Sequence, residues 1–275
     1  MNYEKKKEEY TKKINELCTL KGYSKKTADA YSHVTKKYIE FLSKTSLNMN
    51  IESVKYYLLS LDLSTNSSRL HYAALRFLFK DILRRPFSID EVPNKKKEKR
   101  LPMVLSKEEI KKMIENTSNI KHRIIIKLLY SSGMRLEELI NLRRDNIDFD
   151  KNTIHVRQGK GKKDRNTIIA ESLKLDLLKY YSQNTFNTKF LLEGREGRYS
   201  KKSVQLVLKK AGNDIGKRVT PHMLRHSFAT HLLDDGISTS HIQKLLGHSD
   251  IKTTNTYLHV SKKDISKIRN PLDNM

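Results

Sequence analysis

The sequence has little of what several classes of protein depend on. Cys18 is the only cysteine in 275 residues, so the chain can form neither an internal disulfide nor a cysteine-based zinc site or iron–sulfur cluster. No segment approaches the roughly 18 apolar residues that a membrane span needs. The first residues, MNYEKKKEEYTKKINEL, carry charges throughout and lack the apolar stretch of a signal peptide. These absences predict a soluble, cytoplasmic protein that is not associated with a membrane.

Acidic residues are also in the minority. There are 55 lysines and arginines against 31 aspartates and glutamates, which gives a formal net charge of +24. This excess is larger than solubility requires, and it predicts a polyanionic partner. Nucleic acid is the first candidate and an acidic membrane surface is the second. A general drift of the composition toward lysine and asparagine could account for part of the charge.

A charged linker divides the chain into two regions. In residues 1–93, the segments 24–44, 51–62 and 66–85 place apolar residues at helical spacing, and Pro86 ends the third segment. We therefore expect a small all-helical domain over 1–93. Residues 94–102 carry a run of lysines, which is typical of an exposed linker. Such a linker is usually a solvated connector, and in a nucleic-acid-binding protein it can also follow the phosphates.

The second region, 103–275, is expected to combine helices with a small sheet. Ser106 and Glu109 form a capping-box pattern before its first helix. Residues 123–133 and 134–142 are expected to be helical. Three short strands are expected next, in IDFD, 153–158 and 165–170. Residues 159–164 are expected to form the hairpin connection between the last two. Helical patterns return over 172–182, 201–212, 222–234, 239–247 and 251–259. The predicted fold class is therefore mainly α with a small antiparallel β-sheet, and no internal repeat is evident.

Six polar residues of the second region stand out by their order and spacing. The first follows a glycine near a helix start, and the second lies at the tip of the basic hairpin. The third and fourth are three residues apart, so they share one face of a helix. The fifth follows a glycine at a helix end, and the sixth lies nine residues later. In order, these residues are Arg135, Lys160, His222, Arg225, His248 and Tyr257.

This pattern resembles the tyrosine recombinases of the phage integrase family. The matching segments are GMRLEEL, GKGKKDR, PHMLRHSFATHLL and LLGHSDIKTTNTY, and together they cover the second region. The helical first region resembles the core-binding domain of the family more weakly. The resemblance implies a helical SAM-like core-binding domain over 1–93, a basic linker over 94–102, and an α/β catalytic domain over 103–275 that ends in a tail for subunit exchange.

The resemblance also implies how DNA would be broken. Tyr257 is the implied nucleophile, which attacks phosphorus and leaves a 3′-phosphotyrosyl bond and a free 5′-hydroxyl. Arg135 and Arg225 are implied to hold the non-bridging phosphate oxygens with their planar guanidiniums. The resemblance implies that Lys160 is the general acid and that His222 acts in proton transfer and phosphate positioning. His248 is implied to donate a hydrogen bond to the phosphate or to orient neighbouring groups, and Glu138 to support the site.

No cofactor or metal is expected, since the sequence lacks the acidic cluster of a two-metal nuclease. His222 and His226 lie four residues apart and could form a zinc pair. Met223, however, stands where that motif needs a carboxylate general base. His226 and His231 are more typical of a packed helix. The basic hairpin also leaves Lys162 and Lys163 as alternatives to Lys160.

The interpretation is a site-specific recombinase that acts on double-stranded DNA with inverted-repeat core sites, and is nucleoid-associated. The family implies a homotetramer, or a heterotetramer with a paralogue, that exchanges strands through a Holliday junction. The compact length favours the Xer type, which resolves chromosome or plasmid dimers, and a small integrase of a mobile element is the alternative. A DNA-binding protein with a decayed site and a topoisomerase are the alternatives from other classes.

Overall fold

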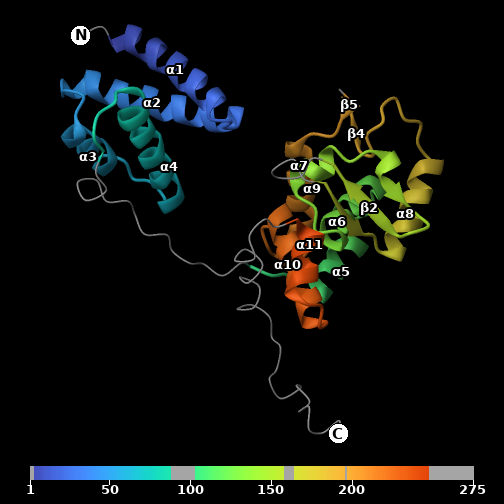
Figure 1. The fold of residues 1–275 in the computed structure, drawn as a ribbon. Helices are drawn as coiled ribbons and strands as arrows, with labels where there is room; N and C mark the ends of the chain where they lie inside the picture. Colours follow the sequence, from blue (N-terminus) through green and yellow to red (C-terminus); the bar gives the residue numbers. More distant parts are fainter. Residues whose placement is uncertain (1–2, 88–102, 158–163, 196, 248–275) are drawn as a thin grey trace, which may run out of the picture. The chain divides into compact units, whose positions relative to one another are not determined.

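The computed structural model describes residues 3–87, 103–157, 164–195 and 197–247 (Figure 1). Contacts within the chain divide it into two compact units, Met1–Arg100 and Leu101–Met275, which we call unit 1 and unit 2. Each unit has a hydrophobic core of its own. Over the described ranges, the structure contains no helix that is both long and apolar enough to cross a membrane.

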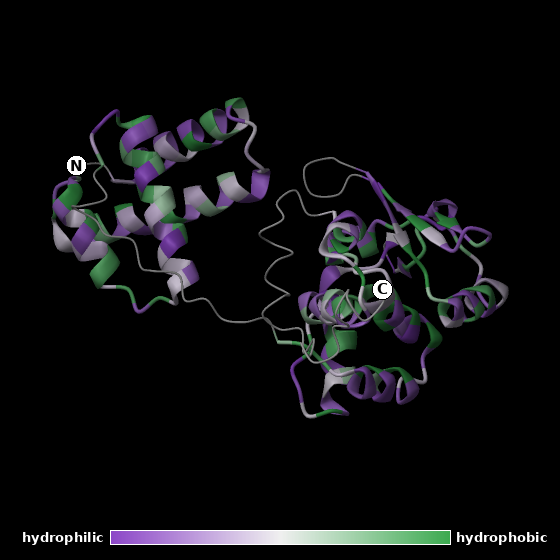
Figure 2. Cartoon of the chain, turned by 60° about the horizontal axis from the view of Figure 1, so that its bottom comes forward, coloured by the Kyte–Doolittle hydropathy of each residue, from purple (hydrophilic) through white to green (hydrophobic). Residues whose placement is uncertain are grey.

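The regular elements of unit 1 are all helices over its described residues. Its helices α1 and α2 pack against each other, and α2 also contacts α3 and α4. Each helix turns an apolar face inward, and Figure 2 shows the resulting alternation of hydrophobic and hydrophilic residues along the helices. The elements are α1 (Tyr3–Leu20), α2 (Lys25–Thr45), α3 (Ile51–Leu59), α4 (Thr65–Arg76) and the π-helix η1 (Phe77–Ile82).

The predicted helix over 66–85 differs from the structure in its last turns. At Phe77 the α-helix becomes a π-helix, in which the N–H of Leu83 donates to the carbonyl of Leu78, five residues earlier, at 2.9 Å. The wider turn allows Phe77, Leu78 and Phe79 to be buried side by side. Three adjacent apolar residues are compatible with several helix types. Their spacing therefore predicted a helix, but not the change from an α-helix to a π-helix.

A buried polar pair lies inside unit 1. The hydroxyl of Tyr57 is 3.1 Å from Nδ1 of His71, and the two rings stack with their centroids 5.7 Å apart. Burial lowers the pKa of His71 below its ordinary value of 6.5, and the positive charges of Lys37 and His33 act in the same direction. The imidazole is therefore neutral at neutral pH.

This pair makes the stability of the protein depend on pH. Because the pKa of His71 is lower in the folded chain, the unfolded chain binds the proton more tightly. The contribution of His71 is complete above about pH 6.5 and is lost as the pH falls. Wild type should therefore be more stable than His71→Gln at pH 7.5, and the difference in Tm should narrow toward pH 5 in thermal melts. A constant difference would show that His71 does not titrate in this way.

Unit 2 is built around helix α6, which contacts five other helices. Its residues Ile124, Ile125, Ile126, Leu128 and Leu129 have no exposed surface. The helices of the unit are α5 (Lys107–Glu115), α6 (Ile120–Ser131), α7 (Leu136–Ile140), the 3₁₀-helix η2 (Arg144–Asn146), α8 (Glu171–Ser182), α9 (Lys201–Asn213), α10 (Pro221–Asp234) and α11 (Thr239–Leu246).

The sheet of unit 2 is small and antiparallel, as predicted. Strands β1 (Ile147–Asp148), β2 (Thr153–Val156) and β3 (Arg165–Ile168) lie in the order β1-β2-β3, with Ile154 opposite Thr167. A second hairpin, β4 (Glu193–Gly194) and β5 (Gly197–Arg198), was not predicted. The capping box at the start of α5 is confirmed, and the expected helix over 251–259 lies outside the described residues.

Candidate active site

Arg135 stands at the N-terminus of α7 and is held by Glu138. The backbone N–H of Arg135 donates to Oε2 of Glu138, and its Nη1 donates to Oε1, each at 2.8 Å. The turn before it depends on Gly133, whose φ of 59° lies in the left-handed region. A Cβ at position 133 would lie 2.6 Å from the ring of Phe228. One carboxylate therefore both caps the helix and orients the arginine.

A second arginine, which the sequence motifs did not single out, binds the same carboxylate. Arg165 is the first residue of β3, and it donates from Nη1 to Oε1 of Glu138 at 2.8 Å and from Nη2 to Oε2 at 2.7 Å. Such parallel pairs are among the strongest hydrogen bonds in proteins. The only signal in the sequence was the arginine that closes GKGKKDR, in a loop already rich in positive charge.

Glu138 remains ionised although it is buried. Its side chain is 4% exposed, and that of Arg165 is 7% exposed. Burial alone would raise the pKa of Glu138, but the hydrogen bonds and charges of Arg165 and Arg135 outweigh it and lower this pKa to about 2. At neutral pH the carboxylate is therefore a fixed negative charge between two guanidiniums.

The third arginine, Arg225, lies inside α10, where it is 3% exposed. Its Nη1 donates to the carbonyl of Gly133, and its Nη2 donates to the carbonyl of Leu246 at 2.7 Å. These bonds explain how a largely buried stretch of α10 accommodates a permanent charge. They also join the turn before Arg135 to the end of α11.

The C-terminal end of α11 receives all three arginines. A helix leaves its last carbonyls without intrahelical donors, and that end carries partial negative charge. Three successive carbonyls at this end each accept one bond: that of Leu245 from Nε of Arg165 at 2.8 Å, that of Leu246 from Nη2 of Arg225 at 2.7 Å, and that of Gly247 from Nη2 of Arg135 at 3.3 Å. We call Arg135, Glu138, Arg165 and Arg225 the arginine cluster.

His222 lies one helical turn before Arg225 and keeps an exposed surface. Partial burial of its ring lowers its pKa, and the charges of Arg225 and Arg135 lower it further. His226 follows, with its ring centroid 6.4 Å from that of His222 and its pKa lowered to about 4 by burial. Both rings are therefore neutral at neutral pH. Within the part of the chain that the structure describes, no three histidine, cysteine or acidic side chains are grouped as metal ligands.

The structure brings Arg135, Glu138 and Arg225 to one place, with His222 near the two arginines. The other predicted residues, Lys160, His248 and Tyr257, lie outside the described residues. In the sequence they adjoin the cluster, since Lys160 precedes Arg165 by five residues and His248 directly follows Gly247. The catalytic roles of all these residues stay predictions.

Comparison with known proteins assigns the chain to a family. Residues 103–264 match the family model described as the phage integrase family, and residues 11–89 match the model of its N-terminal SAM-like domain. The chain belongs to the phage integrase family. Members of this family are tyrosine recombinases, which cleave and rejoin DNA through a tyrosine nucleophile. The predicted family and fold class are thus confirmed.

The relatives of this integrase-family chain include recombinases of the Xer type. Tyrosine recombinase XerA of Pyrococcus horikoshii is 34% identical over 248 residues, which cover 89% of this chain and 79% of the relative. A crystal structure of XerA recombinase has 29% identity and a TM-score of 0.55, and covers 92% of this chain and 94% of that one. A crystal structure of XerH site-specific recombinase bound to difH substrate, in a pre-cleavage complex, has 22% identity and a TM-score of 0.72. The match covers 90% of this chain and 82% of that one. At this identity, the likeness supports the fold alone.

The end of α11 gives a stability prediction. Gly247 has a φ of 63°, and a Cβ there would lie 2.7 Å from Cδ of Arg165, which is held at both Glu138 and Leu245. Gly216 is a matched control, because its φ is 66° and a Cβ there meets nothing within 4 Å. Gly216→Ala should cost about 1 kcal/mol in unfolding free energy, and Gly247→Ala at least about 1 kcal/mol more from overlap. Urea unfolding measures both, and equal losses would contradict the contact.

Proposed function

We propose that this chain is an Xer-like site-specific recombinase in which Arg135 and Arg225 of the arginine cluster hold the scissile phosphate for attack by Tyr257. The observation that supports the proposal most strongly is the anchoring of Arg135 and Arg225 to adjacent carbonyls, those of Gly247 and Leu246. Two guanidiniums fixed at neighbouring points can meet the non-bridging oxygens of one phosphate. In cells, this protein would act on double-stranded DNA of the nucleoid, resolving dimers of chromosomes or plasmids.

The charge of the cluster suits this reaction. Three guanidiniums and one ionised carboxylate leave a net charge of +2. A phosphodiester carries one negative charge, and its transition state for attack carries about two. Fixed positive charge that is already in place when negative charge develops stabilises the transition state more than the substrate.

The proposed reaction conserves the phosphodiester bond energy. The phenolic oxygen of Tyr257 attacks phosphorus, the bond to the 5′ oxygen breaks, and Lys160 supplies a proton to that oxygen. The reverse attack by a 5′-hydroxyl, from the same or another duplex, restores the DNA and frees the tyrosine. His222, neutral at neutral pH, is suited to accept the proton of the tyrosine. His248 would donate a hydrogen bond to the phosphate.

The organisation of the chain follows from the same proposal. Residues 1–93 would be the core-binding domain, 94–102 the linker, and 103–275 the catalytic domain. On DNA, four copies, or two copies each of this chain and a paralogue, would bind two inverted-repeat sites and exchange strands through a Holliday junction. The tail after Tyr257 would dock on a neighbouring copy.

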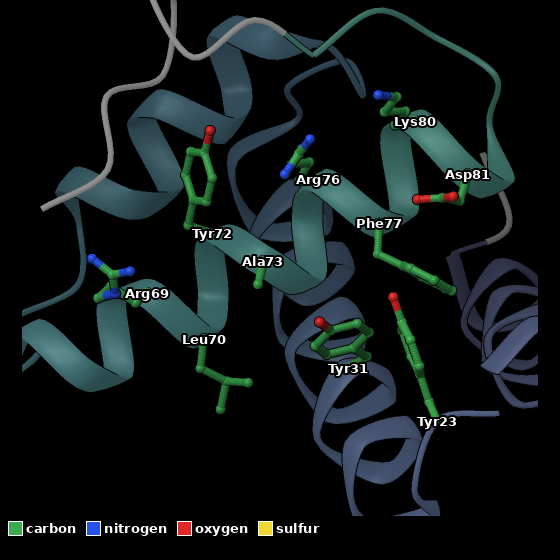
Figure 3. Close-up of a pocket in the computed structure, with 10 residues that line it drawn as sticks. All are labelled: Tyr23, Tyr31, Arg69, Leu70, Tyr72, Ala73, Arg76, Phe77, Lys80 and Asp81. Carbon is green, nitrogen blue, oxygen red and sulfur yellow. The ribbon is translucent and has the colours of Figure 1, made fainter. Parts of the chain in front are cut away.

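Unit 1 offers a basic surface that suits a DNA backbone. A hollow of about 580 Å³ lies beside α4 and η1, and Figure 3 shows Arg69, Arg76 and Lys80 along these helices. All three side chains are exposed. Tyr23 and Tyr31 approach Phe77 in the same hollow, with ring centroids 6.1 and 5.3 Å from that of Phe77. We propose that this surface contacts phosphates.

The salt dependence of binding tests that surface. Arg76→Ala should weaken DNA binding and lower the slope of log K against log salt by about 0.9, the value expected for one lost phosphate contact. Lys12→Ala, which removes one exposed charge from α1, is the control and should leave the slope unchanged. Electrophoretic mobility shifts across a salt series measure both, and equal slopes for the two variants would place the DNA elsewhere.

The covalent intermediate tests the proposed function itself. Incubation with nicked suicide duplexes of randomised sequence should trap a protein–DNA adduct that survives SDS electrophoresis. Tyr257→Phe should abolish the adduct, and EDTA should not. A simple DNA-binding protein traps nothing. Deletion between two recovered sites on one plasmid would then separate recombination from the relaxation that a topoisomerase performs.

A further inference from the structure

We propose that Arg165 is a positioning residue of the cleavage reaction: it neutralises the buried carboxylate of Glu138 and thereby leaves the charge of Arg135 for the scissile phosphate. The inference rests on the proposed function, because it assigns the phosphate to Arg135. It adds a residue that makes no contact with the reacting atoms.

The carboxylate of Glu138 is shared equally by its two partners. Oε1 accepts from Nη1 of Arg135 and Nη1 of Arg165, and Oε2 accepts from the backbone N–H of Arg135 and Nη2 of Arg165. Each oxygen has two lone pairs, so the four bonds fill both. Without Arg165, half of the hydrogen bonds to a buried charge would be missing.

The net charge of this group depends on Arg165. Arg135 and Glu138 alone form a pair with no net charge. A phosphate oxygen that bound this pair would meet the guanidinium and, just behind it, a carboxylate that repels it. The repulsion would be strong, because the site is largely removed from water. Arg165 cancels the carboxylate, and the group regains one net positive charge.

Arg165 and Arg135 differ in their exposure and in the number of their N–H groups that bind the protein. The Arg165 side chain is 7% exposed, and its Nε, Nη1 and Nη2 all donate to protein acceptors. The Arg135 side chain is 21% exposed. Its guanidinium uses two of its five N–H groups, on Glu138 and Gly247, and the other three have no partner among the described residues. Arg165 is thus committed to the protein, whereas Arg135 retains donors for a ligand.

The test compares two replacements of similar size. Arg165→Gln removes the charge, and Arg165→Lys keeps it without the planar fork. On a suicide duplex that wild type has selected from the randomised pool, adduct formation at saturating DNA should slow by about 10²-fold in Arg165→Gln and by less than about tenfold in Arg165→Lys. The Kd for DNA should stay within a few-fold of wild type in both. Thermal melts show that each protein is folded.

A double variant gives the decisive readout. If Arg165 acts by neutralising Glu138, then Glu138→Gln combined with Arg165→Gln should form the adduct at least about tenfold faster than Arg165→Gln alone. A double variant that is no faster, or equally slow Gln and Lys variants, would overturn the inference. If Arg165→Gln does not fold, adduct formation is measured instead in Arg165→Lys and in the double variant. The inference requires that both of these proteins still form the adduct. Absence of an adduct in wild type would instead refute the proposed function.

Discussion

The arrangement of the arginine cluster depends on the carbonyls at the end of α11. Those of residues 245–247 each accept a bond from one arginine, and the three arginines come from β3, α10 and the N-terminus of α7. These elements are far apart in the sequence, and the three bonds join them at one point. The negative end of a helix is a natural place to gather cations, and here it fixes several of them at once.

Gathering cations requires a counter-charge, and Glu138 provides it. A buried ion is tolerated only when its hydrogen bonds are complete, and this carboxylate has all of them. The cluster keeps an excess of positive charge, which suits an anion. Stability and function therefore make opposite demands on the same residues: full compensation would be more stable, and incomplete compensation can bind phosphate.

The sequence predicted the features that local patterns encode. Strands β2 and β3, the capping box before α5 and the family motif around Arg135 all follow from residue type and spacing. The contacts of Arg165 could not be predicted in this way. Its acceptors are the main-chain carbonyl of Leu245 and the carboxylate of Glu138, 27 residues away, and no residue near GKGKKDR indicates either of them. The β4–β5 hairpin has two residues in each strand, which is too few to show the alternation of apolar and polar residues that is typical of a strand. The π-helix depends on burial of Phe77 and its neighbours, which spacing alone does not reveal.

The anchors at the end of α11 are main-chain atoms, which has a consequence for how the chain can vary. Replacing the side chain of Leu246, which is fully buried, changes the core and leaves its carbonyl acceptor in place. Insertion or deletion of a single residue within α11 is different, because each residue turns a helix by about 100°. The three acceptors would then point elsewhere together. The arginine anchors therefore constrain the length of this helix, whereas its composition is constrained by the packing of Ile242 and Leu246.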